Sequence, residues 1–222
     1  MAPPRILKRF AMPTNEPHDA EVHWENVYRT KASDSVSWHR EHLETSLALL
    51  EQAGLSSDSR IIDVGGGAST LVDDLLARGV NQVTVLDLSW AALDIASARL
   101  GPRARTVQWM AGDVTSLALP DGEYSHWHDR TVLHFLTRQD QVAAYVHQAT
   151  HALMVGGHAV IGGFAPDGPV RCSGLDVARR SAQDIARLSG RGFKLLDCRR
   201  ELHRTPDGNE QAFEYALLQR TG

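Results

Sequence analysis

The sequence predicts an α/β protein in which a doubly wound, mostly parallel sheet lies between two layers of helices. From Arg60 onward, short apolar segments suited to buried strands alternate with segments of helical periodicity. The first of these strands runs directly into a glycine-rich turn and a helix, over residues 60–70. With 222 residues, the chain is long enough for one large core and too short for two comfortable domains.

The individual elements follow from these patterns in chain order. Five parallel strands are predicted from apolar runs bounded by turn residues, at 60–64, 82–86, 105–110, 124–128 and 158–163. The helices between them are predicted at 69–78, 89–100 and from Thr137 to Gly156-Gly157. After a helix at 181–189, strands at 193–202 and 211–218 flank a turn sequence, Thr205-Pro206-Asp207-Gly208-Asn209. The sheet is therefore expected to have seven strands and to end in an antiparallel hairpin.

The segment before the sheet divides into an arm and two helices. Residues 1–15 are rich in proline and basic residues without usable periodicity, so we expect a flexible arm. Apolar spacing predicts a short helix within 16–31 and a second one around Leu43, Leu47 and Leu50 that ends at Gly54.

Composition excludes several classes of function. A net charge of −4 gives no general basic field for a nucleic-acid backbone. The two cysteines, Cys172 and Cys198, have neither disulfide-framework nor zinc-site spacing, so no metal is expected. No apolar run approaches the roughly 18 residues of a membrane span, and no secretory signal is evident. We therefore expect a cytoplasmic protein that binds neither membranes nor polynucleotides.

The glycine turn indicates a nucleotide cofactor. Glycines without a Cβ let the backbone of Gly65-Gly66-Gly67 come close to a ligand, and the following helix begins with unpaired N–H groups. Asp87 ends the second strand about 20 residues later, where a carboxylate can accept hydrogen bonds from both ribose hydroxyls. An NAD site shares both features, but its glycine pattern requires a small residue where Thr70 stands.

These motifs, with the terminal hairpin, resemble the class I S-adenosylmethionine-dependent methyltransferase family, a seven-stranded Rossmann-like fold, over residues 55–222. The match is incomplete, because Ser69 replaces the usual third glycine. The resemblance implies S-adenosylmethionine as cofactor, with Asp63 near its amino group or near the amides of the turn, Asp87 at the ribose, and Asp113 and Val114 at the adenine. Leu88 is a further candidate cofactor contact. It also implies that the helices of residues 16–54 form a lid, with Tyr28 as the lid residue toward the cofactor. Packing of aromatic residues onto the core explains Trp24 equally well.

Residues that act on the substrate are expected at the end of the fourth strand and in the loop after the fifth. His128 and Asp129 come at that strand end, and His134 follows on a short helical turn where it would serve as a base or as a structural histidine. Candidate substrate contacts are Trp38, His39, Arg171 and Cys172. Beside Arg171, Cys172 is either a low-pKa thiolate or inert.

The resulting hypothesis is methyl transfer to a small molecule, such as a thiol or related chalcogen compound. Two alternatives stay open. The leader containing Trp24, Tyr28 and Val36-Ser37-Trp38 also resembles the start of small protein lysine methyltransferases, although His128-Asp129-Arg130-Thr131 matches their fourth-strand motif only in part. The second alternative is a non-catalytic module that only binds S-adenosylmethionine, and the intact glycine turn argues against this alternative.

Overall fold

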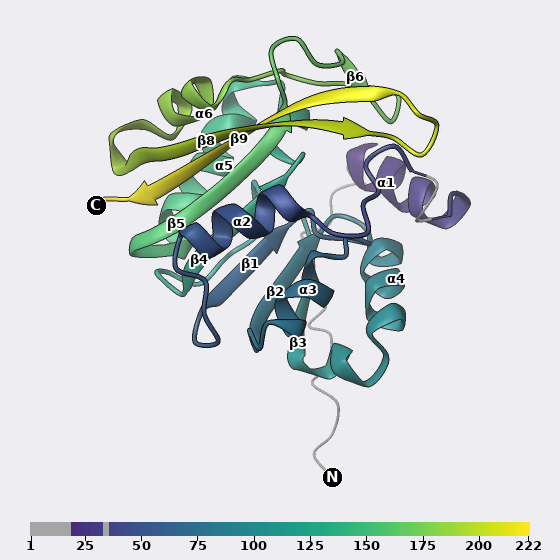
Figure 1. Ribbon diagram of the computed structural model, residues 1–222, viewed down its shortest axis with the longest axis horizontal. Coiled ribbons are helices and arrows are strands. Elements are labelled where there is room, and N and C mark those ends of the chain that lie inside the picture. The colour runs from purple at the N-terminus through teal and green to yellow at the C-terminus, as the bar shows by residue number, and fades with distance from the viewer. Residues whose placement is uncertain (1–18, 33–35) are drawn as a thin grey trace.

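The computed structural model describes residues 19–32 and 36–222. Its seven-stranded sheet has the order β3-β2-β1-β4-β5-β9-β8, in which β1 to β5 run parallel and β9 and β8 are antiparallel (Figure 1). The strands are β1 (Arg60–Val64), β2 (Gln82–Asp87), β3 (Val107–Ala111), β4 (Tyr124–Arg130), β5 (Leu153–Phe164), β8 (Phe193–Arg204) and β9 (Glu210–Arg220). The predicted fold class is confirmed. The arm predicted at residues 1–15 lies outside the described residues.

Helices cover both faces of the sheet, each over its own hydrophobic cluster. One face carries α2 (Glu44–Gln52), α3 (Leu71–Ala77) and α4 (Trp90–Leu100), and the other carries α5 (Gln139–Ala152) and α6 (Ala182–Ser189). Ile61 and Ile62 are both fully buried and belong to different clusters, as expected when successive side chains of a central strand point to opposite faces. The molecule therefore has the predicted three layers.

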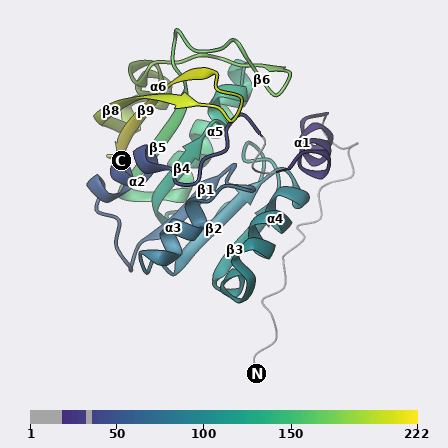
Figure 2. The same ribbon diagram turned by 45° about the vertical axis from the view of Figure 1, so that its right-hand side comes forward.

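The two N-terminal helices differ in position. In α2, Leu49 and Leu50 are fully buried in the core, so this helix belongs to one of the layers. In contrast, α1 (Asp19–Thr30) lies beyond the carboxyl ends of the central strands, beside α4 (Figures 1 and 2). A carboxylate oxygen of Glu25 accepts hydrogen bonds from Ser89 Oγ at 2.7 Å and from the Ala91 N–H at 3.1 Å. The anion at the start of α4 thus attaches α1 to the domain.

Several element boundaries differ from the sequence prediction, and three of these differences concern strands β3, β4 and β5. A 3-10 turn (Gly101–Thr106) follows α4 and delays β3 to Val107. Strand β5 begins at Leu153, inside the predicted helix, because the ladder to β4 starts there with an irregularity and Gly156 adopts a φ of +84°. Strand β4 continues to Arg130, two residues beyond its predicted end.

A small two-stranded sheet and the terminal hairpin complete the fold. Strands β6 (Arg171–Cys172) and β7 (Leu175–Asp176) form within the loop that follows β5. The predicted turn between β8 and β9 is confirmed, because the Thr205 N–H donates to the Asn209 carbonyl at 2.8 Å.

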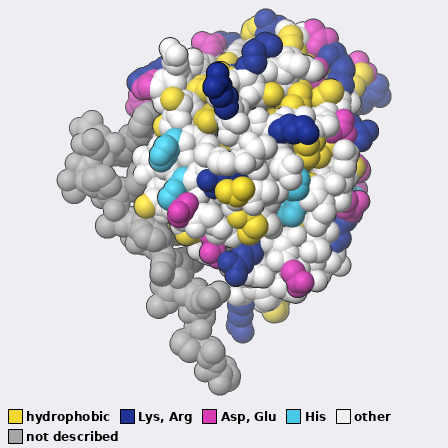
Figure 3. Space-filling view, turned by 90° about the vertical axis from the view of Figure 1, so that its left-hand side faces the viewer, with side chains coloured by type: hydrophobic (Ala, Val, Ile, Leu, Met, Phe, Trp, Pro, Cys, Tyr) yellow, Lys and Arg dark blue, Asp and Glu magenta, His cyan; other side chains and the backbone are white. Residues whose placement is uncertain are grey.

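Positive and negative side chains are interspersed on the face shown in Figure 3. Within residues 19–32 and 36–222, no helix combines the length and apolar character that a membrane span requires.

Candidate functional site

A cavity of about 380 Å³ opens at the carboxyl ends of β1, β2, β3 and β4. Side chains from α1, from the segment after it and from the β6–β7 loop complete its walls. The cavity brings together most of the residues predicted from the sequence, namely Tyr28, Trp38, His39, Asp63, Gly65, Gly66, Asp87, Leu88, Asp113, Val114, His128 and Cys172. Four predicted residues, Gly67, Asp129, His134 and Arg171, do not line it.

Asp63 and His128 form a buried pair at the floor of the cavity. His128 Nδ1 lies 2.7 Å from Asp63 Oδ1, and His128 Nε2 lies 2.9 Å from Ser46 Oγ on α2. With the proton on Nδ1, the imidazole donates to Asp63 and accepts from the serine hydroxyl. Both ring nitrogens are occupied, so His128 has no free nitrogen for a substrate. The second oxygen of Asp63 is buried without a hydrogen-bond partner among the described residues, so its capacity to accept a hydrogen bond is unused within them.

The glycine turn is required by close packing of the protein itself. A Cβ on Gly65 would lie 2.1 Å from Val132 Cγ2, and one on Gly67 would lie 2.6 Å from Asp87 Oδ2. A Cβ on Gly66 would lie 2.4 Å from Asp63 Oδ2. Gly65 also has a φ of +69°, which disfavours any side chain. The glycines therefore let the turn pass directly over the carboxylates of both strand ends.

Asp87 lies at the end of β2 with one oxygen accepting from the Ser89 N–H at 2.8 Å. Burial raises the pKa of its carboxyl to about 7, and the nearby charge of Asp63 adds to the shift. At the end of β3, Asp113 Oδ1 accepts from the N–H of Thr115 at 2.8 Å and from its hydroxyl at 2.7 Å. The edge thus presents carboxylates from three successive strands, alongside the buried Val114.

Aromatic rings form another part of the cavity wall. Trp24 of α1 lies 5.7 Å from Trp38 and 5.1 Å from Phe135 between ring centroids, both edge-to-face, and Tyr28 lies 6.3 Å from Trp38. All four rings line the cavity. Of the two N-terminal helices, α1 contributes residues to the cavity wall and α2 contributes none.

Asp129 was expected at the substrate, but it faces away from the cavity. Because side chains alternate along β4, His128 and Arg130 point toward α2 whereas Trp127 and Asp129 point toward α5. The oxygens of Asp129 accept from the N–H groups of Val132 and Leu133 and, at 2.6 Å, from the hydroxyl of Tyr145. Its carboxylate thus holds the chain after β4.

His134 is also directed away from the cavity. Its ring lies 4.3 Å from that of Phe135 and 4.9 Å from that of Phe164, centroid to centroid, and neither nitrogen has a hydrogen-bond partner among the described residues. Burial lowers its pKa to about 3, with help from the charges of Arg130 and Arg180. A buried imidazole that stays neutral and lies outside the cavity fits a structural role.

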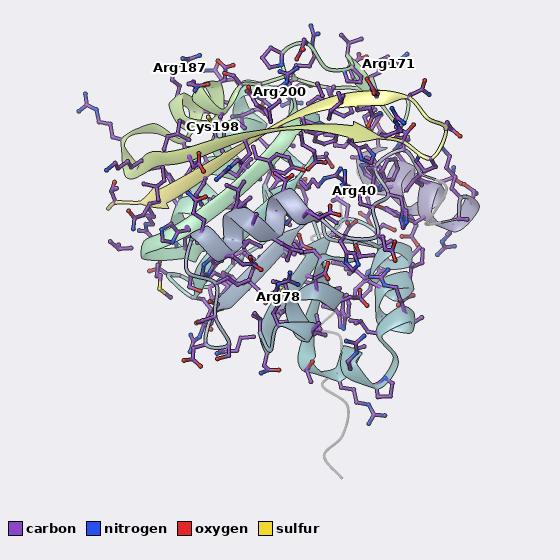
Figure 4. The ribbon with its side chains drawn as sticks, in the orientation of Figure 1. Arg40, Arg78, Arg171, Arg187, Cys198 and Arg200 are labelled. Carbon is purple, nitrogen blue, oxygen red and sulfur yellow. The ribbon has the colours of Figure 1, made fainter. Side chains whose placement is uncertain are left out.

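The side chains of Arg171 and Cys172 point in opposite directions, because they are successive residues of strand β6. Arg171 points to solvent and pairs with Asp176 at 3.1 Å, at the outer rim of the molecule in Figure 4. Cys172 lines the cavity, but burial raises the pKa of its thiol to about 11. The thiol stays protonated at neutral pH, which contradicts the low-pKa thiolate interpretation.

The structure adds residues that the sequence interpretation missed. Arg130 lines the cavity because β4 is longer than predicted, and continuing the alternation from His128 would have identified it. Thr131 lines the cavity with a φ of +86°, an unusual conformation for a β-branched residue. Within the described residues, no group of three or more histidine, cysteine, aspartate or glutamate side chains is placed to hold a metal.

Comparison with known proteins identifies a known domain within the chain. The profile of a methyltransferase domain family matches residues 61–157, which span β1 through the start of β5. The chain contains a class I S-adenosylmethionine-dependent methyltransferase domain. S-adenosylmethionine is therefore its cofactor. Among curated protein sequences, none matches the chain.

Solved structures share the fold of this methyltransferase along nearly its whole length. A protein described in the conversion of a disulfide bond into a thioacetal group during echinomycin biosynthesis has a TM-score of 0.75 at 20% identity, covering 92% of this chain and 94% of its own. An Anabaena variabilis S-adenosylmethionine-dependent methyltransferase has a TM-score of 0.71 at 16% identity, with coverages of 93% and 97%.

A third structure includes bound ligands. The Burkholderia thailandensis 1,6-didemethyltoxoflavin-N1-methyltransferase, solved with 1,6-didemethyltoxoflavin and S-adenosylhomocysteine, has a TM-score of 0.69 at 21% identity and coverages of 96% and 93%. At these identities the likeness concerns the fold.

Proposed function

We propose that this methyltransferase transfers a methyl group to a small molecule held between the carboxylate edge and the aromatic wall of the cavity. The observation that carries this proposal is that both surfaces line one cavity, which α1 and the β6–β7 loop narrow. Two of the similar structures described above are associated with small molecules in their descriptions, which is consistent with an acceptor of this size. The aromatic part of its wall suits an acceptor that is itself largely apolar, and we propose a thiol as the nucleophile of that acceptor.

The cofactor-binding residues fit S-adenosylmethionine. The unpartnered oxygen of Asp63 needs a donor, which the amino group of the cofactor would supply. We assign Asp87 to the ribose hydroxyls, Asp113 and Val114 to the adenine, and Leu88 and Tyr28 to contacts around them. Gly65, Gly66 and Gly67 shape the turn that brings these groups together, Gly67 by making room for the carboxylate of Asp87.

When bound, S-adenosylmethionine supplies an electrophilic methyl group on a sulfonium. The protein then has to align a nucleophile, exclude water and, where necessary, remove one proton. The rings of Trp24, Tyr28 and Trp38 serve the first two tasks, because they are rigid, apolar and contributed by segments that close over the edge of the sheet.

His39 is the proposed proton acceptor. It lines the cavity, it is half-buried, and its ring makes no hydrogen bond with any described residue. His128 and His134, the histidines first expected to act on the substrate, lack this combination: His128 is held by Asp63 and Ser46, and His134 is outside the cavity. A free imidazole nitrogen beside the acceptor can take a proton from a thiol or an amine.

Release of S-adenosylhomocysteine with a panel of small thiols, amines and acids, and separately with protein extracts, tests the proposal. We expect turnover with a member of the small-molecule panel. His39→Ala should reduce turnover while leaving S-adenosylhomocysteine affinity unchanged, and the matched control His42→Ala, on an exposed residue outside the cavity, should change neither. Turnover with protein extracts alone would instead support the lysine methyltransferase alternative.

A further inference from the structure

Arg130 places a buried positive charge in the cavity. It is the last residue of β4, opposite Gly162 of β5, and its side chain points to the same face of the sheet as His128. The residue is only 9% exposed to solvent, yet it lines the cavity.

Neutral groups hold the guanidinium in place. Its Nε donates to the hydroxyl of Tyr215 at 3.1 Å, its Nη1 donates to the carbonyl of Trp38 at 3.0 Å, and its central carbon lies 4.6 Å from the ring centroid of Phe213. The third nitrogen, Nη2, is buried and has no hydrogen-bond partner among the described residues. The group is therefore fixed in orientation, while both N–H groups of Nη2 remain unused.

No carboxylate of the described residues pairs with Arg130. The contrast with Arg40, the other arginine that lines the cavity, is direct, because Arg40 donates to Glu44 at 2.8 Å and to Glu201 at 3.0 Å. Figure 4 shows Arg40 between α2 and α1. Buried charges in proteins are ordinarily paired, and a buried donor without a partner is costly. An uncompensated arginine in a binding cavity therefore favours an anionic ligand.

We propose that Arg130 binds an oxyanion of the methyl acceptor, so that the preferred acceptors are flat, largely apolar acids whose ring lies against the aromatic wall. This inference rests on the proposed function for the identity of the cavity, and it adds the chemical class of the substrate. The carboxylates of Asp63, Asp87 and Asp113 would repel an acid from their end of the cavity, which leaves the Arg130 end for the acidic group.

The carboxylate of the cofactor itself is the competing occupant of this donor. The two possibilities differ in what a change at Arg130 should affect. If Arg130 binds the acceptor, its substitution lowers affinity for acids and spares the affinity for S-adenosylhomocysteine. If it binds the cofactor, S-adenosylhomocysteine affinity falls instead.

Calorimetric titration of the full chain with matched probe pairs tests the inference. The probes are benzoate against benzamide and indole-3-acetate against indole-3-acetamide, with and without saturating S-adenosylhomocysteine. We expect each acid to bind about tenfold or more tightly than its amide, because only the acid offers a charge-assisted hydrogen bond. Equal binding of acid and amide, or no binding of either acid, would overturn the inference without any mutation.

Variants of Arg130 test whether this residue causes the preference for acids over amides. Arg130→Gln should abolish the preference for acids, Arg130→Lys should retain part of it, and the exposed control Arg200→Gln should leave it intact (Figure 4). All three should bind S-adenosylhomocysteine as the wild type does, and a selective loss of that affinity in Arg130→Gln would overturn the inference. If Arg130→Gln does not fold, Arg130→Lys and the wild-type pairs decide. Failure of the wild type to bind S-adenosylhomocysteine would refute the proposed function alone, because the acid preference is also measured without it.

Discussion

The imidazole of His128 and the carboxylate of Asp63 meet across two adjacent parallel strands, with 2.7 Å between Nδ1 and Oδ1. The two residues are register partners between β1 and β4, so their separation is set by the ladder itself. This contact fixes one oxygen of Asp63 and leaves the other without a partner. We therefore interpret His128 as a positioning residue for the cofactor-binding carboxylate.

His128→Ala should weaken S-adenosylhomocysteine binding and lower the free energy of unfolding by about 1 to 3 kcal/mol, because Asp63 and Ser46 each lose a buried partner. Calorimetry and urea denaturation measure the two effects. The matched control is His126→Ala, two residues earlier on the same face of β4, where the ring contacts Ser125 and the Ala53 carbonyl. The control should lose stability but keep cofactor affinity. Loss of affinity in both variants would indicate general damage to the fold.

Cofactor affinity should decrease as the pH is lowered from 8 to 6, because the pKa of Asp87 is raised to about 7. Ribose hydroxyls donate to the ionised carboxylate, so S-adenosylhomocysteine should bind about tenfold more weakly at pH 6 than at pH 8 and should release a proton on binding. Titrations in two buffers of different ionisation enthalpy measure both quantities. Asp87→Asn should remove the dependence, and equal wild-type affinity at the two pH values would contradict the assignment.

The raised pKa of Asp87 also makes the free energy of unfolding of the ligand-free protein depend on pH, in the direction opposite to that of cofactor affinity. Its pKa in the folded state is higher than the ordinary value of 3.8, so the folded protein binds the proton more tightly between these values. The contribution of Asp87 to the free energy of unfolding should therefore rise as the pH falls from 7 toward 4. Comparing wild type with Asp87→Asn by urea denaturation at both pH values isolates that contribution.

Gly65→Ala should destabilise the turn more than backbone strain alone explains. Gly54 has a similar φ of +83° with nothing within 4 Å of an added Cβ, so Gly54→Ala should cost only about 1 kcal/mol. Gly65→Ala adds the collision with Val132 and should cost about 1 to 3 kcal/mol more. Val132→Ala in the same chain should recover part of this excess. No recovery in denaturant unfolding would contradict the packing explanation.

Tyr145→Phe should destabilise the protein by about 1 to 3 kcal/mol, since the buried Trp127 N–H, 2.9 Å from the tyrosine hydroxyl, would lose its acceptor and Asp129 would lose a donor. Cofactor affinity should be unchanged, because this network lies on the α5 face of the sheet. A large loss of turnover with unchanged unfolding free energy would return Asp129 to a catalytic role.

Much of the fold follows from local sequence patterns. The range predicted for β1 agrees with the observed one, and the turn between β8 and β9 lies at the residues for which it was predicted. Both predictions are correct because turn-forming residues and apolar runs determine structure locally. The start of β5 was missed because it depends on pairing with Tyr124, a partner that is distant in sequence. The separate positions of α1 and α2 likewise depend on tertiary contacts, such as that of Glu25 with Ser89.

The candidate site was predictable where chemistry and chain position coincide. Asp63 and Asp87 stand at strand ends that the sequence marks clearly, and both line the cavity. Asp129 was expected to contact the substrate, whereas Arg130 was not expected in the site. Because β4 extends through both residues, the alternation of side chains turns Asp129 toward α5 and Arg130 toward the cavity. The aromatic wall joins α1 to Phe135, more than 100 residues away, and no local pattern reports such a contact.

Binding of S-adenosylhomocysteine to the wild type and to Asp87→Ala is the most direct measurement of the central claim, that the cofactor lies along the edge formed by β1 and β2. The account predicts saturable binding to the wild type and a loss of about 1.5 to 3 kcal/mol in the variant, with Asp121→Ala, at an exposed carboxylate, as the unaffected control. Equal affinity of Asp87→Ala and wild type, or no binding to either, would contradict it.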